Sequence, residues 1–189
     1  MHGYNDYMLL LRPDEHISFQ IGNFKALAAN IIGDYPSMHS AAHISIKQYP
    51  RQKPYVIQPA MENLERNLNI MRAVRLQINN FRFFATKDAR YTIYAVIEPT
   101  YKSDEWFSTL CKHMHINKKQ LVPHITVVRT IDENSFLRLW PHFRYKVFRD
   151  SFLVTHFTIL ERETLNTRAK WQIYRDIKFR PLEEDSIAI

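Results

Sequence analysis

The seven residues 123–129, Pro-His-Ile-Thr-Val-Val-Arg, place a histidine, a hydroxyl group and a cation within an otherwise apolar stretch. Apolar and β-branched residues in such a run are typical of a β-strand, on which successive side chains point to opposite faces. His124 and Thr126 would then share one face, with Ile125 and Val127 on the other. The stretch therefore predicts a strand that presents an imidazole and a hydroxyl group together.

A similar stretch lies 81 residues earlier, where residues 42–47 read Ala-His-Ile-Ser-Ile-Lys. Strand alternation would place His43, Ser45 and Lys47 on one face. Two strands that each offer an imidazole beside a hydroxyl group are suited to binding and cleaving a phosphate ester without a metal ion. We therefore take the two stretches as one candidate site.

The pattern of His, apolar residue, Ser or Thr, apolar residue also begins at His16 and at His156. His16 falls in the first turn of a predicted helix, where residues two apart point in directions about 200° apart, so we expect a surface residue. His156 lies on a predicted strand with Thr158 on its own face. It has acidic neighbours and no counterpart in the first half of the chain, so we expect a neighbour of the site or a core histidine.

The composition is that of a globular protein, with 46% hydrophobic residues and only three glycines among 189 residues. Lys and Arg exceed Asp and Glu by 26 to 19, and this excess favours anionic partners such as RNA, nucleotides or phosphates. The single cysteine, Cys111, excludes an internal disulfide and fits a reducing compartment. Neither a secretory signal nor an apolar run of about 18 residues is apparent, so we expect a cytoplasmic protein that does not enter a membrane.

Hydrophobic periodicity predicts that strands and helices alternate, and that the two motif strands hold matching places in two similar halves. We expect a single α+β domain over residues 1–189, with two intimately packed lobes and the two histidines in one cleft. A proline-interrupted loop is expected at residues 50–59. The predicted strands are 7–11, 42–49, 74–85, 90–97, 123–130, 147–161 with a bend near 150–151, and 171–179; the predicted helices are 17–31, 60–71, 104–114 and 132–143.

The paired motifs, their spacing, Lys47 and the run at residues 123–129 resemble the two-histidine (2H) phosphoesterase superfamily. Within it, the chain is most similar to the 2'-5' RNA ligase-like proteins, which include RNA 2',3'-cyclic phosphodiesterases. The resemblance implies a bilobal, pseudo-two-fold α+β fold, with two antiparallel sheets and outer helices around a central cleft, and no metal or other cofactor. Gln48-Tyr49-Pro50 stands where Phe-Leu-Gly is common in the family, which leaves the subfamily and the substrate open.

Hydrolysis of a cyclic phosphate needs a base for the attacking water and an acid for the departing sugar oxygen, and two histidines can share these roles near neutral pH. We assign His43 as the acid and His124 as the base, with the roles exchanged for ligation. Ser45 and Thr126 would donate hydrogen bonds to the phosphate oxygens as charge develops.

Two cations are expected to bind the substrate's phosphate or RNA backbone. Lys47 is placed there by alternation. The resemblance implies the same role for Arg129, although an odd spacing from His124 would turn it away on a regular strand. A β-bulge or the end of the strand would be needed to bring Arg129 to the histidine face.

Several other features of the sequence allow more than one interpretation. Tyr49 or Tyr55 would either stack on a base or pack as an ordinary surface tyrosine. The basic residues between 162 and 180 would contact RNA phosphates or form a solvated face. Cys111 and His115 lie one helical turn apart, but no second cluster completes a metal site. The chain is expected to be a monomer that acts on RNA or nucleotide cyclic phosphates; a non-catalytic RNA- or nucleotide-binding module is the alternative.

Overall fold

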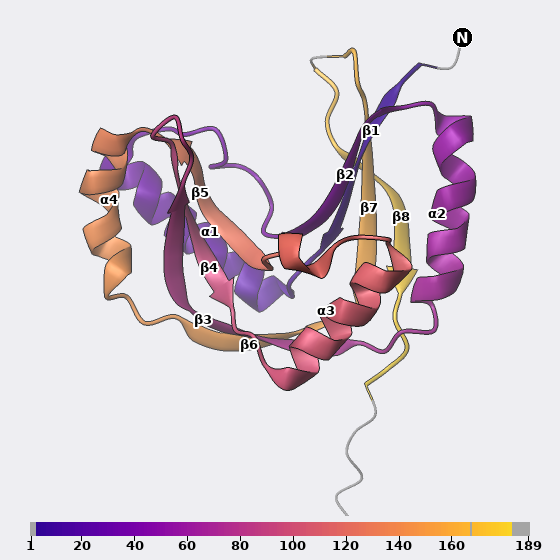
Figure 1. The fold of residues 1–189 in the computed structure, drawn as a ribbon. Helices are drawn as coiled ribbons and strands as arrows, with labels where there is room; N and C mark the ends of the chain where they lie inside the picture. Colours follow the sequence, from indigo (N-terminus) through magenta and orange to yellow (C-terminus); the bar gives the residue numbers. More distant parts are fainter. Residues whose placement is uncertain (1–2, 167, 183–189) are drawn as a thin grey trace, which may run out of the picture.

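The computed structural model describes residues 3–166 and 168–182, which form two four-stranded antiparallel sheets (Figure 1). The first sheet contains β2 (Ile44–Gln52), β1 (Asn5–Leu11), β7 (His156–Glu163) and β8 (Gln172–Lys178), in that order. The second sheet contains β5 (His124–Ile131), β4 (Tyr91–Ile97), β3 (Val74–Ala85) and β6 (Arg149–Val154), in that order. The helices are α1 (Glu15–Ile32), α2 (Pro54–Leu68), α3 (Tyr101–His113), the short 3-10 helix η1 (Lys118–Gln120) and α4 (Glu133–Arg144).

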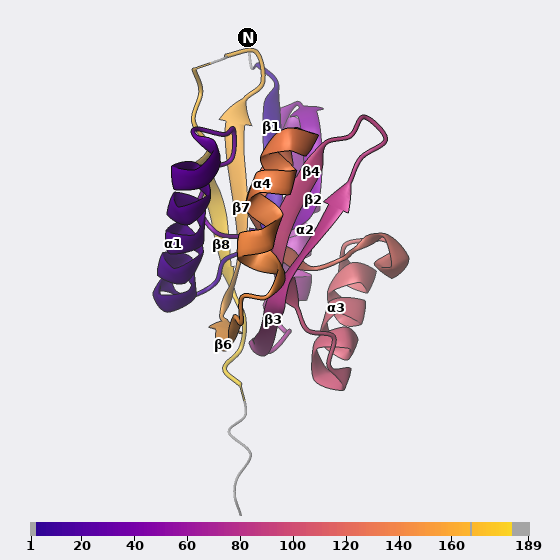
Figure 2. The same cartoon turned by 90° about the vertical axis from the view of Figure 1, so that its left-hand side faces the viewer.

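Each sheet is the centre of one lobe, as expected for a bilobal α+β fold. The first lobe is the first sheet with α2, and the second lobe is the second sheet with α1 and α4 (Figures 1 and 2). Although α1 follows a strand of the first sheet, it packs against α4 and β5 of the second lobe. Phe24 of α1 makes edge-to-face ring contacts with Phe81 and Phe148 there, which fixes this crossing of the chain.

The two motif strands occupy equivalent places in the two sheets. In the orders β2-β1-β7-β8 and β5-β4-β3-β6, β2 and β5 are each an edge strand, and each pairs with the strand that precedes it along the chain, β1 or β4. The two edges contact each other where the lobes meet. The two motif strands therefore lie side by side, as predicted, although they belong to different sheets.

The longest predicted strand is in fact two strands. Residues 147–161 were expected to bend near 150–151, whereas the chain breaks at Thr155 between β6 and β7. β6 pairs with β3 and β7 pairs with β1, so this segment passes from one sheet to the other. Apolar periodicity alone does not reveal such a change of partner.

The loop expected at residues 50–59 is partly helical, because α2 begins at Pro54. A proline at the start of a helix has no N–H to leave unpaired, so Pro54 is well suited to this position. Pro59 lies inside the helix and removes one internal hydrogen bond. The apolar face of α2 compensates by burying Ile57 and Met61, together with Leu64 and Leu68.

None of the helices in the described ranges is long and apolar enough to cross a membrane.

Candidate active site

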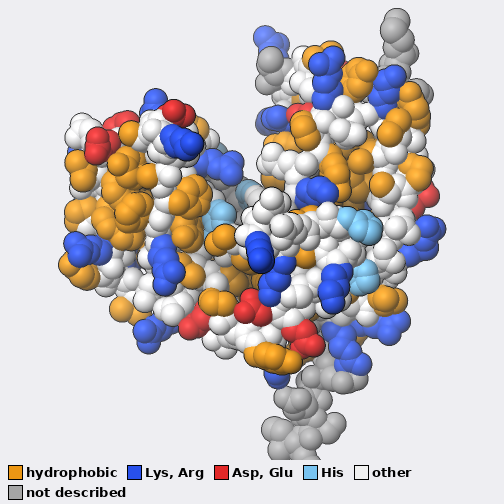
Figure 3. Space-filling model, in the orientation of Figure 1, with side chains coloured by type: hydrophobic (Ala, Val, Ile, Leu, Met, Phe, Trp, Pro, Cys, Tyr) orange, Lys and Arg blue, Asp and Glu red, His pale blue; other side chains and the backbone are white. Residues whose placement is uncertain are grey.

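Both motif histidines lie where β2 and β5 approach each other. His43 immediately precedes β2, and His124 is the first residue of β5. Figure 3 shows a hollow between the two lobes, with histidine side chains on its floor. The imidazoles of His43 and His124 are close enough for charge on His124 to lower the pKa of His43. Two halves of the chain therefore contribute one histidine each to a shared site.

The two imidazoles are held in the same way. Nδ1 of His43 lies 2.8 Å from the carbonyl oxygen of Ala41, and Nδ1 of His124 lies 2.7 Å from that of Val122. A carbonyl oxygen can only accept, so each Nδ1 must carry the proton of this hydrogen bond. In the neutral state, each Nε2 is then unprotonated and available to accept a proton.

The surroundings of both imidazoles favour the neutral form. Burial is the main cause that lowers the pKa of His43, and positive charge on Lys25, Arg129 and His124 acts in the same direction. Burial also lowers the pKa of His124, again with help from Arg129. The hydrogen bonds to the backbone carbonyls oppose these effects in both cases. The site is thus positively charged, as a site for an anionic group would be.

A β-bulge follows the hydroxyl residue in each motif strand. In the pairing of β1 with β2, Leu10 is opposite Ser45 but Leu9 is opposite Lys47, which leaves Ile46 as an extra residue. β5 has the same irregularity against β4, because Thr126 and Val128 are opposite consecutive residues and Val127 is extra. Ser45 and Thr126 precede the bulges, so each lies on the same face of its strand as the histidine two residues before it, as expected.

The prediction that Arg129 lies on the histidine face required a β-bulge in its strand, and β5 contains one. The extra residue Val127 reverses the alternation, so Arg129, which follows Val128, returns to the face of His124 and Thr126. The pairing shifts once more between Val128 and Ile131, where Thr130 has a φ of 60°. Its effect on the pKa of both histidines agrees with this position. The side chain is exposed and can reach a bound anion.

The bulge in β2 has the opposite effect on Lys47. Residues that pair directly across antiparallel strands point to the same face, and Lys47 pairs with Leu9 whereas Ser45 pairs with Leu10. The alternation that put Lys47 beside His43 therefore does not hold. Gln48, opposite Met8, takes the place on the Ser45 face that Arg129 has in the other strand.

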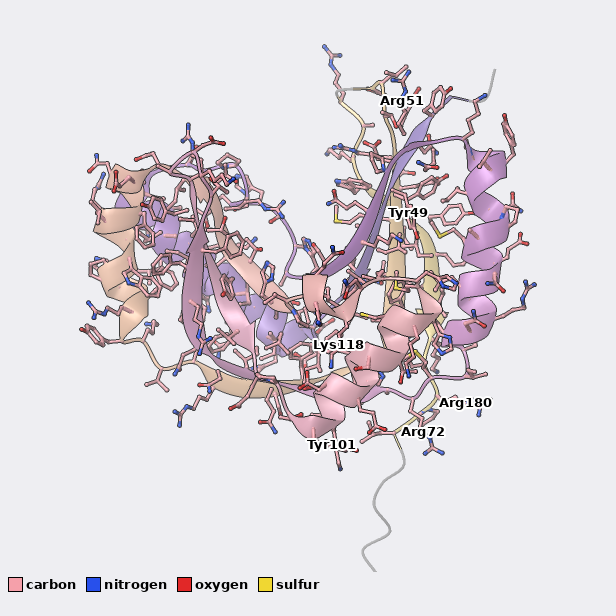
Figure 4. All side chains as sticks on the ribbon, viewed as in Figure 1. Tyr49, Arg51, Arg72, Tyr101, Lys118 and Arg180 are labelled. Atoms are coloured by element: carbon pink, nitrogen blue, oxygen red, sulfur yellow. The ribbon has the colours of Figure 1, made fainter. Side chains whose placement is uncertain are left out.

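Tyr49 shares the face of Lys47. The Lys47 ammonium lies 4.8 Å from the centre of the Tyr49 ring, and Tyr49 lines a pocket with Met61 and Leu64 of α2. Figure 4 shows Tyr49 on the side of β2 that faces α2. Neither Lys47 nor Tyr49 is brought together with the two histidines. Tyr55 is 60% exposed on α2.

Aromatic side chains that the sequence did not single out lie beside His124. The centre of its ring is 4.9 Å from that of Tyr94 and 5.8 Å from that of Phe84, and these two rings are 5.4 Å apart. Phe84 is 43% exposed. Arg82 pairs with Tyr94 across the strands and so adds a cation to the same face. We call Phe84 and Tyr94, together with the neighbouring Arg82, the aromatic wall.

The other histidine motifs lie outside this site. His16 is exposed and bonds Asp150 at 3.0 Å, as expected for a surface residue. His156 is exposed at the start of β7, which β1 separates from β2, and its Nδ1 bonds the Thr155 hydroxyl. His156 is therefore not a core histidine. Within residues 3–166 and 168–182, no three His, Cys, Asp or Glu side chains gather closely enough to hold a metal ion.

The basic segment between residues 162 and 180 has mixed surroundings. Arg162 pairs with Asp6 and lies over the Trp171 ring, and Arg175 pairs with Glu65 of α2. Arg162 and Arg175 are thus paired with carboxylates of the chain itself.

Residues 13–166 match the family model of the 2'-5' RNA ligase superfamily. The chain therefore belongs to the 2'-5' RNA ligase superfamily, a group of 2H phosphoesterases.

Solved structures place the chain in the same fold. Escherichia coli LigT complexed with phosphate has a TM-score of 0.64 at 12% identity, covering 94% of this chain and 99% of LigT. TT0787 of Thermus thermophilus has a TM-score of 0.62 at 13% identity, covering 93% and 98%. Kluyveromyces marxianus Usb1 has a TM-score of 0.51 at 8% identity, covering 92% and 97%. No curated protein sequence matches the chain significantly.

Proposed function

We propose that this protein is a metal-independent phosphodiesterase that hydrolyses 2',3'-cyclic phosphates at RNA ends or on small nucleotides. The observation that carries the proposal is the matched pair of imidazoles, each bonded through Nδ1 to a backbone carbonyl and each offering Nε2 at the meeting of β2 and β5. A site that only bound phosphate would need positive charge but not two equivalent proton acceptors.

The proposed reaction uses one imidazole on each side of phosphorus. His124 takes a proton from water as the water oxygen bonds to phosphorus, and protonated His43 gives a proton to the sugar oxygen as its bond to phosphorus breaks. Burial, together with the cations around His43, lowers its pKa and so makes its imidazolium a stronger acid. In the ligation direction the two histidines exchange roles.

The remaining site residues would bind the phosphate. Ser45 and Thr126 would donate hydrogen bonds to its non-bridging oxygens, where negative charge increases in the transition state. Arg129 would add a charge-assisted hydrogen bond from the same face. Lys47 and Tyr49, which the register turns to the other face of β2, have no part in the proposed chemistry.

A nucleotide substrate is supported by the aromatic wall and by a relative. Phe84 and Tyr94 offer ring faces next to His124, and an aromatic ring can stack on any base. LigT of Escherichia coli has been crystallised with 3'-AMP; that structure has a TM-score of 0.63 at 13% identity. We propose that the base of the terminal nucleotide lies against this wall.

The test is turnover of an RNA oligomer that ends in a 2',3'-cyclic phosphate, with EDTA present. His43→Ala and His124→Ala are each expected to abolish turnover, whereas His156→Ala, an exposed histidine from the same sequence pattern, should leave it unchanged. 2',3'-cyclic mononucleotides serve as a second substrate. A protein that binds both compounds but turns over neither would be a binding module, and damage from His156→Ala would show that the wrong histidine pair was chosen.

A further inference from the structure

Lys25 is a buried lysine on α1, with only 4% of its surface exposed. Its ammonium donates hydrogen bonds to the carbonyl oxygens of Ser37 and Ser40, at 3.0 and 2.6 Å, and to Ser40 Oγ at 2.8 Å. In the described part of the chain, no carboxylate forms an ion pair with it. A buried ammonium without an anionic partner is costly, so its position needs an explanation.

The oxygens that Lys25 binds belong to residues 33–43, the loop that connects α1 to β2 and ends at His43. The same loop is attached to β5 on its other side. The backbone N–H of Arg129 donates to Ser37 Oγ at 2.9 Å, and the Tyr35 hydroxyl lies 3.1 Å from the Lys25 carbonyl oxygen on α1 and 3.4 Å from the Val127 carbonyl oxygen on β5. The loop is thus held between the buried lysine and the strand that carries His124.

The positive charge of Lys25 also affects the imidazole of His43. The groups that act on His43 are Lys25 from α1, and Arg129 and His124 from β5; each lowers the pKa of His43. Of the loop's other ionisable residues, Asp34 and His39 are exposed, and burial raises the pKa of Tyr35 to about 12, so its hydroxyl is uncharged. Burial lowers the pKa of Lys25 to about 8, so most of its ammonium stays protonated at neutral pH.

We propose that Lys25 is a positioning residue for His43: its ammonium fixes the loop that ends at this histidine and keeps a positive charge beside the imidazole. The effect of Lys25 on catalysis, as distinct from its effect on the loop and on the His43 pKa, rests on the proposed function. A cationic side chain is required because it can donate to the converging oxygens and also carry the charge. A neutral residue of similar length would retain the packing but neither of these effects.

The test is NMR titration of the His43 and His124 ring protons in the intact protein and in two variants. Lys25→Met removes the charge and the hydrogen bonds, whereas Tyr35→Phe, the matched control, loosens the same loop without changing any charge. We expect Lys25→Met to raise the pKa of His43 and leave that of His124 in place, and Tyr35→Phe to move neither. An unchanged or lowered His43 pKa in a folded Lys25→Met variant would overturn the proposal.

The unmodified protein gives a second readout that does not depend on whether the variant folds. As Lys25 loses its proton, near pH 8, the His43 ring protons should show a second, smaller step in chemical shift. A titration of His43 without this step would also overturn the proposal.

Turnover adds a third measurement. A misplaced catalytic group can reduce a rate by about a hundredfold, so we expect a loss of about tenfold or more in Lys25→Met, with recovery in Lys25→Arg, which keeps the charge. Recovery of turnover without any charge, in Lys25→Gln, would contradict the role of the ammonium. A protein without turnover would count against the proposed function. The titrations need no substrate, so they would still test the effect of Lys25 on His43.

Discussion

The backbone N–H of Arg129 donates a hydrogen bond to Ser37 Oγ, so the strand that carries His124 holds the loop that ends at His43. The two imidazoles are therefore not positioned independently by two separate strands. Instead, one loop, residues 33–43, is fixed by α1 and β5 of the second lobe and positions His43 at the start of β2 in the first lobe.

Ser37→Ala should both destabilise the protein and slow turnover. Ser37 is buried, and its loss would leave the Arg129 N–H without its acceptor, at a cost of about 1–3 kcal/mol in the free energy of unfolding. Urea denaturation and kcat are the measurements. Ser108→Ala, which removes an exposed hydroxyl bonded within α3, is the control and should change neither. If stability falls while kcat holds, the loop does not position His43.

The pH profile of kcat/KM should be bell-shaped with a maximum below pH 6.5. This parameter reports the free protein, and its maximum lies midway between the pKa values of the acid and the base, whichever residue has which role. Burial and neighbouring cations lower both pKa values from 6.5, so the midpoint must also lie below 6.5. A maximum above pH 7, or a flat profile from about pH 5 to 9, would argue against two-histidine catalysis.

Arg129→Ala should shift that profile to higher pH. Arg129 lowers the pKa of both histidines, so its removal should raise both and move the maximum upward. KM should also rise by roughly ten- to a hundredfold, as expected when a hydrogen bond to a charged group worth about 1.5–3 kcal/mol is lost. Lys47→Ala is the matched control, because this cation lies on the other face of its strand. Equal effects of the two substitutions would mean that the bulges do not decide which cation serves the site.

Phe84→Ala should weaken substrate binding with little effect on the chemical step. Stacking on one base is worth about 1–3 kcal/mol, so KM for a cyclic nucleotide should rise by roughly five- to a hundredfold. Phe19→Ala is a suitable control because Phe19 is 67% exposed on α1, away from the aromatic wall. Equal KM values for the two variants would place the base elsewhere in the cleft.

Much of the fold was open to prediction because local patterns decide it. Apolar alternation located β3 at residues 74–85 without error, and the two motif strands fell within two or three residues of their true bounds. The histidines and hydroxyl residues also follow from the sequence, because His43 and Ser45 precede any irregularity in their strand, as do His124 and Thr126.

What the sequence could not predict depends on contacts between distant segments. A bulge is defined by the strand opposite, so the extra residues Ile46 and Val127 are invisible until β1 and β4 are known to be their partners. That is why Lys47 was expected at the site and Gln48 was not. Alternation along residues 91–97 does place Tyr94 on one face of its strand, but only the sheet order puts that face beside His124.

The route of the chain through the two sheets determines how the protein could be divided. A cut in the exposed turn at residues 86–89 would separate a fragment with β1, β2, β3 and His43 from a fragment with β4 to β8 and His124. Each sheet draws strands from both fragments, and α1 of the first packs on α4 of the second. Neither piece has a complete core, so neither should fold alone, and mixing them should restore a two-part protein in which each fragment supplies one of the two motif histidines.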